Sequence, residues 1–283
     1  MPATIIDGRA IAADIKKDVA QRAHALATHG IIPKCVAVVA EGDSAGLLYA
    51  QTAKRAGAEA GIEIEIVPVG AGADTAGAIA IVARVVEEPT AHGVIIQRPL
   101  PKKVDESRVI DALDLKKDVD CSHPQNIGLL AIGAPRYVPA TAAAVLELLS
   151  RPPVRPIAGA RVTIIGRSPV VGRPAALLLT AADATVTLCH SKTAALAEET
   201  KRADIIVVAA GRPNLLTADM IADGATVIDV GTNVVDGRLV GDVDKSVREK
   251  AGAMTLVPGG VGPVTTAVLL RNVIEAAERA AKH

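Results

Sequence analysis

The fold is decided by Arg161-Val-Thr-Ile-Ile-Gly-Arg-Ser-Pro-Val-Val-Gly-Arg-Pro174, in which an apolar β-branched run meets a glycine. A short loop follows Gly166, and Gly172 then begins a run that suits a helix. This order of strand, turn and helix is typical of a nucleotide-binding βαβ unit, whose helix start faces a pyrophosphate. The spacing is Gly-x-Ser-x-x-x-Gly rather than Gly-x-Gly-x-x-Gly, so a strand–helix corner without a ligand stays open at this point.

The composition predicts an aliphatic core. Half of the 283 residues are hydrophobic, but Trp and Phe are absent and Tyr occurs only at positions 49 and 137. Ala, Val, Ile and Leu must therefore fill the interior, which is typical of buried parallel sheets covered by helices. The length is sufficient for two domains.

Charge and cysteine usage argue against several classes of function. The 31 basic residues balance 31 acidic ones, and no basic stripe indicates a nucleic acid or a membrane as partner. The three cysteines and six histidines are scattered, so we expect neither a disulfide framework nor a metal site. The N-terminus shows no signal peptide and no apolar run has membrane-spanning length, which favours a cytoplasmic location.

Strand-like and helix-like segments alternate along both halves of the chain. The first half is predicted to contain the strands Thr4–Ile6, Cys35–Val39, Glu63–Val67 and Gly93–Gln97, and the helices Ala10–His29, Leu47–Ala60 and Thr75–Glu88. After a proline-rich connection at 151–156, the second half is predicted to contain the strands Val162–Ile165, Thr185–Leu188, Ile205–Ala209 and Thr226–Val230, and the helix Thr265–Lys282. The alternation predicts two open parallel-sheet α/β domains, with an interdomain cleft as the default ligand site.

The end of the second strand in the glycine-turn unit indicates which dinucleotide binds. An acidic residue there would bind the ribose 2′-hydroxyl of NAD. This chain instead has Leu188-Cys-His-Ser-Lys-Thr193, with no acid, and Arg167 of the first loop can join the cations. A hydroxyl and cations suit a 2′-phosphate, which favours NADP. Ser191 is equally suited to cap the next helix, and both roles can hold at once.

Two further glycine-rich segments follow predicted strands. Asp229-Val-Gly-Thr-Asn233 closes one strand, and Pro258-Gly-Gly-Val-Gly-Pro263 precedes the last helix. Three glycines and two prolines in six residues make a stiff loop that another backbone or a ligand can approach closely. A tight turn that merely begins the last helix explains the second segment equally well.

Polar side chains in the first half stand where strands and helices meet. Tyr49 lies near the start of a predicted helix, Gln97 closes a strand, and Asp120 ends Lys117-Asp-Val-Asp120. Open α/β sheets keep their chemistry at the carboxyl ends of strands. Each residue also has a structural explanation by itself: packing for Tyr49, a strand-end hydrogen bond for Gln97 and a turn for Asp120.

Taken in order, these motifs resemble the methylenetetrahydrofolate dehydrogenase/cyclohydrolase family. The resemblance rests on Tyr49, Gln97-x-Pro-Leu-Pro101, Lys117-Asp-Val-Asp120, the 166–174 loop, His190-Ser-Lys192 and Pro258-Gly-Gly-Val-Gly-Pro263. It runs from Ile5-Ile-Asp-Gly8 to the last helix and so covers nearly the whole chain. The final hexapeptide is the most specific of these motifs.

The resemblance implies a homodimeric enzyme that oxidises 5,10-methylenetetrahydrofolate with NADP and hydrolyses the methenyl product to 10-formyltetrahydrofolate. It implies a catalytic, folate-binding domain (1–140 plus 265–283) and a Rossmann-like NADP-binding domain (141–264). The implied catalytic residues are Tyr49, Gln97 and Asp120. These three would also bind folate, with Asp120 on the pterin ring, together with Pro258, Gly259, Gly260 and Gly262. The implied cofactor-binding residues are Gly166, Arg167, Ser168, Gly172, Ser191 and Thr232.

The chain departs from the family at the position of a catalytic lysine. The family has lysine four residues after the tyrosine, where this chain has Ala53 followed by Lys54. No gap restores Lys54, which a helix rotates about 100° from the face of Ala53. Other departures from the family's usual residues are Gly46 for serine, Arg98 for leucine, Cys121 for glycine and Ala140 for cysteine.

These departures affect the two reactions unequally. Hydride transfer needs chiefly the alignment of the reacting carbon with the nicotinamide. Hydrolysis needs water activation, for which a general base typically contributes about 10²–10⁴-fold. We therefore expect dehydrogenase activity with weak or absent cyclohydrolase activity. Three alternatives stay open: a fully bifunctional enzyme in which Lys54 or another group replaces the base, a pocket reshaped for another one-carbon carrier, and a non-catalytic folate- or nucleotide-binding regulatory subunit.

Overall fold

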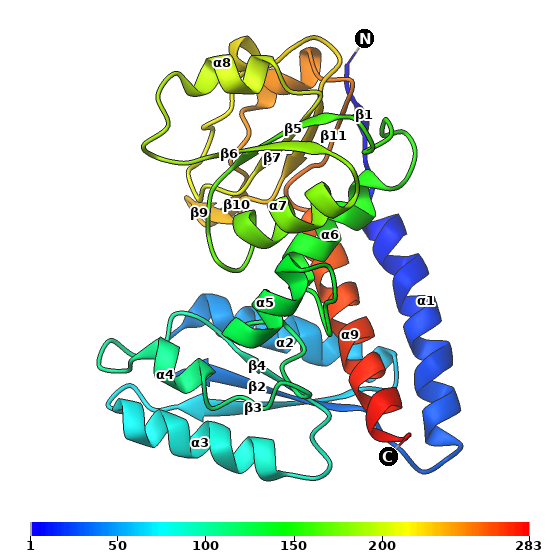
Figure 1. Cartoon of the computed structure of the whole chain (residues 1–283), viewed down its shortest axis with the longest axis vertical. Helices are drawn as coiled ribbons and strands as arrows, with labels where there is room; N and C mark the ends of the chain where they lie inside the picture. Colours follow the sequence, from blue (N-terminus) through cyan, green and yellow to red (C-terminus); the bar gives the residue numbers. More distant parts are fainter. Residues whose placement is uncertain (1, 283) are drawn as a thin grey trace. The chain divides into compact units, whose positions relative to one another are not determined.

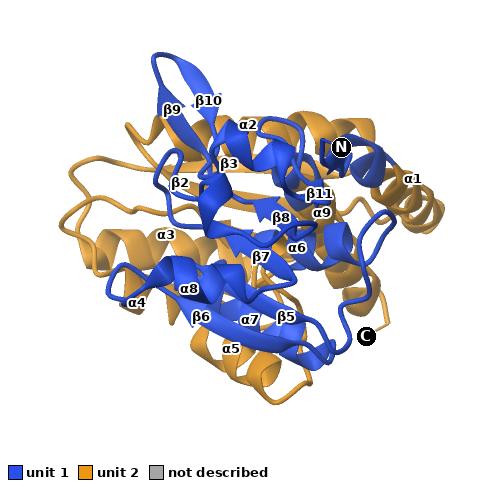
Figure 2. Ribbon diagram, turned by 90° about the horizontal axis from the view of Figure 1, so that it is seen from above, with its two compact units in different colours: residues 1–13, 141–265 blue, residues 14–140, 266–283 orange. Residues whose placement is uncertain are grey.

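The computed structural model describes residues 2–282, which form two compact units (Figure 2). Unit 1 comprises the segment up to Ala13 and Thr141–Thr265, and unit 2 comprises Asp14–Ala140 and the segment from Thr266. Three helices contribute residues to both units: α1 (Gly8–Ala27), α6 (Ala140–Leu149) and α9 (Val261–Ala280). Both units are α/β with parallel sheets, which confirms the predicted fold class.

Unit 2 is built on a three-stranded parallel sheet in the order β3-β2-β4. Its elements are β2 (Lys34–Ala40), β3 (Glu63–Val69), β4 (Gly93–Ile96), α2 (Ser44–Glu59), α3 (Thr75–Glu87), α4 (Glu106–Ile110) and α5 (Pro124–Ala131). Helices α2 and α3 cover opposite faces of the sheet (Figure 1). Valines of β2 and β4 pack against Val82 and Val85 of α3 in an aliphatic cluster.

Unit 1 contains a six-stranded sheet in the order β1-β11-β8-β7-β5-β6, with parallel pairing throughout. Its strands are β1 (Thr4–Ile5), β5 (Arg161–Ile165), β6 (Thr185–Cys189), β7 (Ile205–Val208), β8 (Thr226–Asp229) and β11 (Ala253–Met254). Helices α7 (Gly172–Ala181) and α8 (Leu196–Lys201) belong to the same unit. The strands β9 (Asn233–Val235) and β10 (Arg238–Val240) form a separate antiparallel hairpin.

The structure differs from the sequence-based expectation at both ends of the chain. The first strand pairs with β11, so the N-terminal residues lie in the unit of the glycine turn rather than in unit 2. The last helix begins at Val261, four residues earlier than predicted, because the last residues of the Pro258–Pro263 motif already adopt helical geometry. The short helices α4, α5 and α8 and the β9–β10 hairpin were not expected, because they are too short to show a period.

The described residues contain neither a membrane-spanning helix nor a cluster of metal-ligating side chains. No helix within residues 2–282 is long and apolar enough to cross a membrane. Over the same residues, no group of three or more His, Cys, Asp or Glu side chains could hold a metal ion.

Candidate functional site

The carboxyl edge of the unit 2 sheet gathers the three predicted catalytic residues. Gln97 follows β4 directly, and its backbone N–H donates to the Val38 carbonyl at 2.8 Å. The segment leading to Asp120 runs parallel to β4, because Asp118 forms a bridge with Val94. In this register Asp120 lies level with Ile96, the last residue of β4, which directly precedes Gln97.

Asp120 has an unusual electrostatic environment. Burial, assisted by the charge of Asp118, raises the pKa of its carboxyl group to about 6. A hydrogen bond from the Ala140 amide, 2.9 Å from Oδ1, and the positive charge of Arg98 act in the opposite direction. Arg98 thus lies close enough to influence Asp120, while its Nε is 3.7 Å from Glu106 Oε2. A perturbed carboxyl group at a sheet edge is a candidate for a functional role.

Tyr49 belongs to the same environment. It lies on α2 and is largely buried, and burial together with the charge of Asp120 raises the pKa of its hydroxyl above the usual value. The phenol is therefore protonated at neutral pH and can donate a hydrogen bond. Tyr49 and Asp120 together offer a neutral donor and an acceptor.

The turn that carries Asp120 is fixed by buried side chains. Asp118 accepts hydrogen bonds from the backbone amides of Ser122 and His123 and from Asn126 Nδ2, at 2.7 to 2.9 Å. Cys121 has a φ of 53°, a left-handed conformation that favours glycine, which is the family's usual residue there. Asn272 of α9 donates to the carbonyls of Val119 and Val138. The carboxyl group of Asp120 is consequently held in one place.

The structure shows the surroundings of the α2 residues that differ from the family's usual ones. Ala53 is fully buried, whereas Lys54 is exposed on another face of the helix, as the helical rotation predicts. A Cβ atom on Gly46 would lie 2.2 Å from Asp43 Oδ2 and 3.3 Å from Gln97 Cβ. The Asp43 carboxyl group, which caps α2 by accepting from the Gly46 amide, therefore fills the space beside Gln97 that a larger residue at position 46 would need.

In unit 1, the glycine turn has the geometry of a nucleotide cradle. Gly166 has a φ of 123°, and a Cβ atom on Gly172 would lie 1.8 Å from the Gly166 carbonyl oxygen. Only glycine therefore fits at position 172. Ser168 Oγ accepts from the Val171 and Gly172 amides, at 3.1 and 3.4 Å, and so caps the start of α7. Because the hydroxyl occupies these donors, the rest of the turn is left to face a ligand.

A cavity of about 360 Å³ adjoins this turn. Its lining includes the predicted cofactor residues Gly166, Arg167, Ser168 and Ser191, together with His190, Thr193 and Arg212. Ser191 does not cap the following helix, because α8 begins at Leu196 with Ala195 as its cap residue. Arg212 was not singled out from the sequence; a cation just after the strand β7 is the signal that could have found it.

The remaining predicted residues lie apart from that cavity. Thr232 is exposed between β8 and β9 and does not line it. Pro258, Gly259 and Gly260 form the loop before α9, with a hydrogen bond from the Gly260 amide to the Leu256 carbonyl, and Gly262 lies in the first turn of that helix. A Cβ atom on Gly8 would lie 1.9 Å from the Gly260 carbonyl oxygen, so Gly8 allows its backbone to approach that of Gly260 closely.

Comparisons with known proteins match both halves of the chain. Residues 6–120 match the family model of the tetrahydrofolate dehydrogenase/cyclohydrolase catalytic domain, and residues 139–281 match that of its NAD(P)-binding domain. "Bifunctional protein FolD" of Parafrankia sp. is 48% identical over 96% of this chain and 98% of that protein. The protein of the same name from Moorella thermoacetica is 43% identical over 99% of this chain and 100% of that protein.

Solved structures agree with these relatives. The bifunctional FolD enzyme of Campylobacter jejuni superimposes with a TM-score of 0.94 at 35% identity, covering 98% of this chain and 99% of that one. The methylenetetrahydrofolate dehydrogenase-cyclohydrolase of Trypanosoma brucei, solved with NADP and an inhibitor, gives a TM-score of 0.95 at 37% identity, covering all of both chains. The predicted resemblance is confirmed, and the chain belongs to the tetrahydrofolate dehydrogenase/cyclohydrolase family.

Proposed function

We propose that this chain oxidises 5,10-methylenetetrahydrofolate to 5,10-methenyltetrahydrofolate with NADP as the hydride acceptor. The observation that carries the proposal is the set Tyr49, Gln97 and Asp120 at one sheet edge, in a chain that matches the family over both domains. Retention of all three residues argues against a non-catalytic regulatory subunit. Gly46, Arg98 and Cys121 border this edge, and the family match favours tetrahydrofolate over another one-carbon carrier there.

The side chains at this edge suit a reduced pterin. The Asp120 carboxylate can accept hydrogen bonds from the N–H groups of the ring, and charge-assisted bonds of this kind are the strong ones. The Tyr49 hydroxyl stays protonated and can donate to the folate. Gln97 offers both a donor and an acceptor. None of these groups needs to remove a proton during oxidation, because the folate nitrogens stabilise the developing cation; the protein supplies alignment.

The glycine-turn cavity suits NADP. The residues fit a dinucleotide because Gly166 and Gly172 allow close backbone approach, and because Arg167 and Ser191 line the cavity without an acidic residue. Bound NADP would supply the acceptor for the hydride that leaves the methylene carbon. We assign pyrophosphate contact to the turn at 166–172 and 2′-phosphate contact to Arg167 and Ser191.

The test is to incubate the protein with NADP and methylenetetrahydrofolate and to follow NADPH by its absorbance. Formation of NADPH is the expected result. Binding of both compounds without turnover would support the regulatory alternative and overturn the proposed function. Replacing NADP by NAD in the same assay measures the cofactor preference.

The second family activity, hydrolysis of the methenyl product, is a separate proposal. The name shared by the relatives favours a fully bifunctional enzyme over the expectation of weak or absent hydrolysis. The burial of Ala53 and the exposure of Lys54 favour a slow hydrolytic step in this particular chain. We propose that hydrolysis proceeds here without a lysine base and therefore more slowly than in family members that carry one.

The variant Ala53→Lys tests this proposal. It should raise the rate of methenyltetrahydrofolate hydrolysis about 10-fold or more, because it restores a base on the face of α2 that carries Tyr49. The measurement is the loss of methenyltetrahydrofolate absorbance, with thermal unfolding as the check that the enclosed site accepts the longer side chain.

The matched control is Lys54→Ala, which should leave hydrolysis unchanged because Lys54 is exposed on another face. A large loss of hydrolysis in Lys54→Ala would instead show that Lys54 is the replacement base. Hydrolysis by the unaltered protein at the rate of lysine-bearing family members would also contradict the proposal.

We further propose that the chain forms a homodimer. The β9–β10 hairpin exposes three large apolar side chains: Val234, Val235 and Leu239. A two-stranded hairpin is marginally stable by itself, so covering this apolar surface by a second copy would stabilise it. Sedimentation equilibrium is expected to give the dimer mass, and Val234→Glu is expected to shift the protein towards the monomer.

A further inference from the structure

Asp242 is the most completely buried carboxyl group in unit 1, and the proposed chemistry does not use it. Its side chain is inaccessible to solvent and accepts four hydrogen bonds. Oδ2 accepts from the amides of Ala210 and Gly211, at 2.6 and 2.8 Å. Oδ1 accepts from the Arg212 amide and from Asn233 Nδ2, both at 2.8 Å. Three successive backbone amides therefore converge on one side chain.

Those three amides belong to a loop that lines the nucleotide cavity. Ala210 and Arg212 both contribute to the cavity that contains Gly166 and Ser191. Because the loop amides point at Asp242, they are not available as donors to a ligand. The loop is also in contact with the glycine turn, since a Cβ atom on Gly166 would lie 2.1 Å from the Ala209 carbonyl oxygen. Asp242 thus fixes one wall of the cavity.

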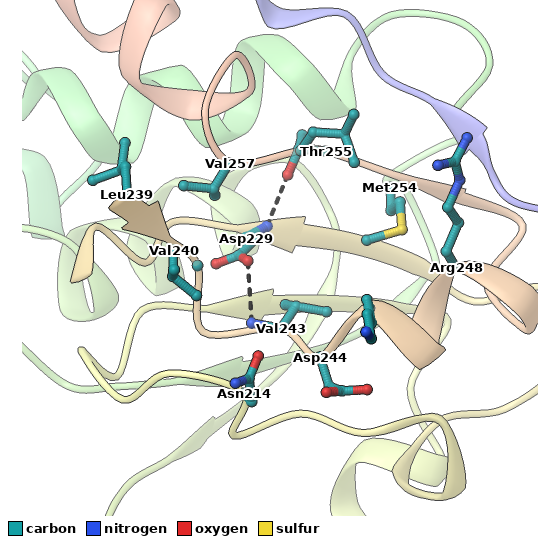
Figure 3. Close-up of a pocket in the computed structure, with 13 residues that line it drawn as sticks. Asn214, Asp229, Leu239, Val240, Val243, Asp244, Arg248, Met254, Thr255 and Val257 are labelled. Carbon is teal, nitrogen blue, oxygen red and sulfur yellow. Dashed lines mark hydrogen bonds between the residues drawn. The ribbon is translucent and has the colours of Figure 1, made fainter. Parts of the chain in front are cut away.

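A second buried carboxyl group holds Asp242 itself in place. Asp229, at the end of β8, accepts from the amide of Asp242 at 2.9 Å and from the amide of Val243 at 3.1 Å. Figure 3 shows the bond from Val243 as a dashed line. The Asp229 amide donates to Thr255 Oγ1 at 2.9 Å, as the other dashed line of Figure 3 shows. A Cβ atom on Gly241 would lie 1.8 Å from Asp229 Oδ2, so only glycine fits at position 241. The carboxyl ends of β7, β8 and β11 are tied together through this pair.

The loop that Asp242 holds contributes Arg212 to the lining of the cavity. No salt bridge to Arg212 is found among residues 2–282, and Arg212 lines the same cavity as His190 and Ser191. The end of β6, where those two residues lie, is the place where this fold distinguishes a 2′-hydroxyl from a 2′-phosphate. The pyrophosphate, by contrast, is expected at the glycine turn that begins at Gly166.

We propose that Arg212 joins Arg167 and Ser191 in binding the 2′-phosphate of NADP, and that Asp242 is the positioning residue that fixes the backbone of the loop carrying Arg212. This inference rests on the proposed function and deepens it by naming determinants of cofactor choice. Guanidinium and phosphate form charge-assisted, often bidentate hydrogen bonds. A movement of the loop that breaks them therefore lowers the affinity for NADP strongly. Asp242 acts on the nucleotide only through the loop.

Binding measured by calorimetry, without folate, tests the role of Arg212. Arg212→Gln should weaken binding of NADP and of adenosine 2′,5′-bisphosphate about 10- to 100-fold, while leaving NAD and AMP nearly unchanged. Arg202→Gln is the matched control, because Arg202 is an exposed arginine of the same unit outside the cavity. An equal loss for nucleotides with and without the 2′-phosphate would overturn the assignment.

A double-mutant cycle tests the role of Asp242. Asp242→Asn should lower the ratio of NADP affinity to NAD affinity although Arg212 is present, and adding Arg212→Gln should then lower the ratio little further. Fully additive effects on this ratio would show that Asp242 has only a structural role. Asp111→Asn, an exposed carboxyl variant in unit 2, should leave NADP affinity unchanged. Normal NADP binding without folate oxidation would overturn the proposed function but not this inference.

Discussion

Replacing Asp120 by Asn is expected to lower kcat/KM for methylenetetrahydrofolate about 100-fold and, at the same time, to stabilise the protein at neutral pH. The loss of activity follows from the removal of a charged acceptor for the pterin N–H groups, since hydrogen bonds to charged groups contribute about 1.5–3 kcal/mol. The asparagine can still accept the hydrogen bond from the Ala140 amide, so the turn is preserved.

The gain in stability follows from the raised pKa of Asp120. The pKa of Asp120 is about 6 in the folded protein, against 3.8 for an aspartate in the unfolded chain, so the folded state binds the proton more tightly. The stabilisation that protonated Asp120 contributes is then fully present below about pH 4 and is lost as the pH rises through about 6. Asp120→Asn removes this loss and should stabilise the protein by about 1–2 kcal/mol at pH 8, allowing for partial exposure.

Two measurements check the Asp120 prediction. Urea unfolding of both proteins at pH 4 and pH 8 should show the stabilisation only at the higher pH. The kcat/KM of the unaltered enzyme should fall as the pH drops below about 6, because protonation of Asp120 removes the acceptor. Asp111→Asn, an exposed aspartate on the same unit, serves as the control and should change neither quantity. An Asp120→Asn variant with unimpaired kcat/KM would remove Asp120 from the proposed site.

Gly172→Ala should abolish useful NADP binding, raising Kd at least about 100-fold. A Cβ atom at this position would lie 1.8 Å from the Gly166 carbonyl oxygen, which is backbone and cannot rotate away. The start of α7 must therefore move off the glycine turn, and the turn that faces the pyrophosphate is distorted with it. We also expect a loss of about 2–4 kcal/mol in the free energy of unfolding, because the helix start is displaced from a packed position.

Gly128→Ala provides the matched control for that variant. Gly128 lies within α5 in unit 2, and a Cβ atom there meets no other atom within 4 Å. Because alanine is the better helix former, this variant should be stabilised by about 0.5–1 kcal/mol and should bind NADP normally. Calorimetric titration with NADP and thermal unfolding distinguish the two variants. Normal NADP affinity in Gly172→Ala would show that the glycine turn is not the pyrophosphate site.

Much of the fold could be predicted from the sequence because the decisive signals are local. The predicted strands of the two sheets agree with β2 to β8 to within two residues at each end, since continuous β-branched runs between helices indicate buried parallel strands. The Gly166–Gly172 turn was recognisable for the same reason: its steric requirement is met within seven residues. Short elements such as α4 and the β9–β10 hairpin give no periodic signal and were missed.

The positions of the site residues could be predicted only as members of motifs. Tyr49, Gln97 and Asp120 are separated by tens of residues, and the sequence does not state which strands are neighbours. The bridge between Val94 and Asp118 brings Asp120 level with the end of β4, and a shift of one residue in that register would turn its side chain to the other face.

The sequence by itself determined the α/β class, the nucleotide turn, the family and the absence of lysine at position 53, because each is written in adjacent residues. Only the tertiary structure decided that the first strand joins the sheet of unit 1, that Asp120 has a raised pKa, and that Asp242 holds the loop of Arg212. These features depend on strand order, on burial and on hydrogen bonds between distant segments. They arise only when the chain has folded, because burial and long-range pairing have no local signature.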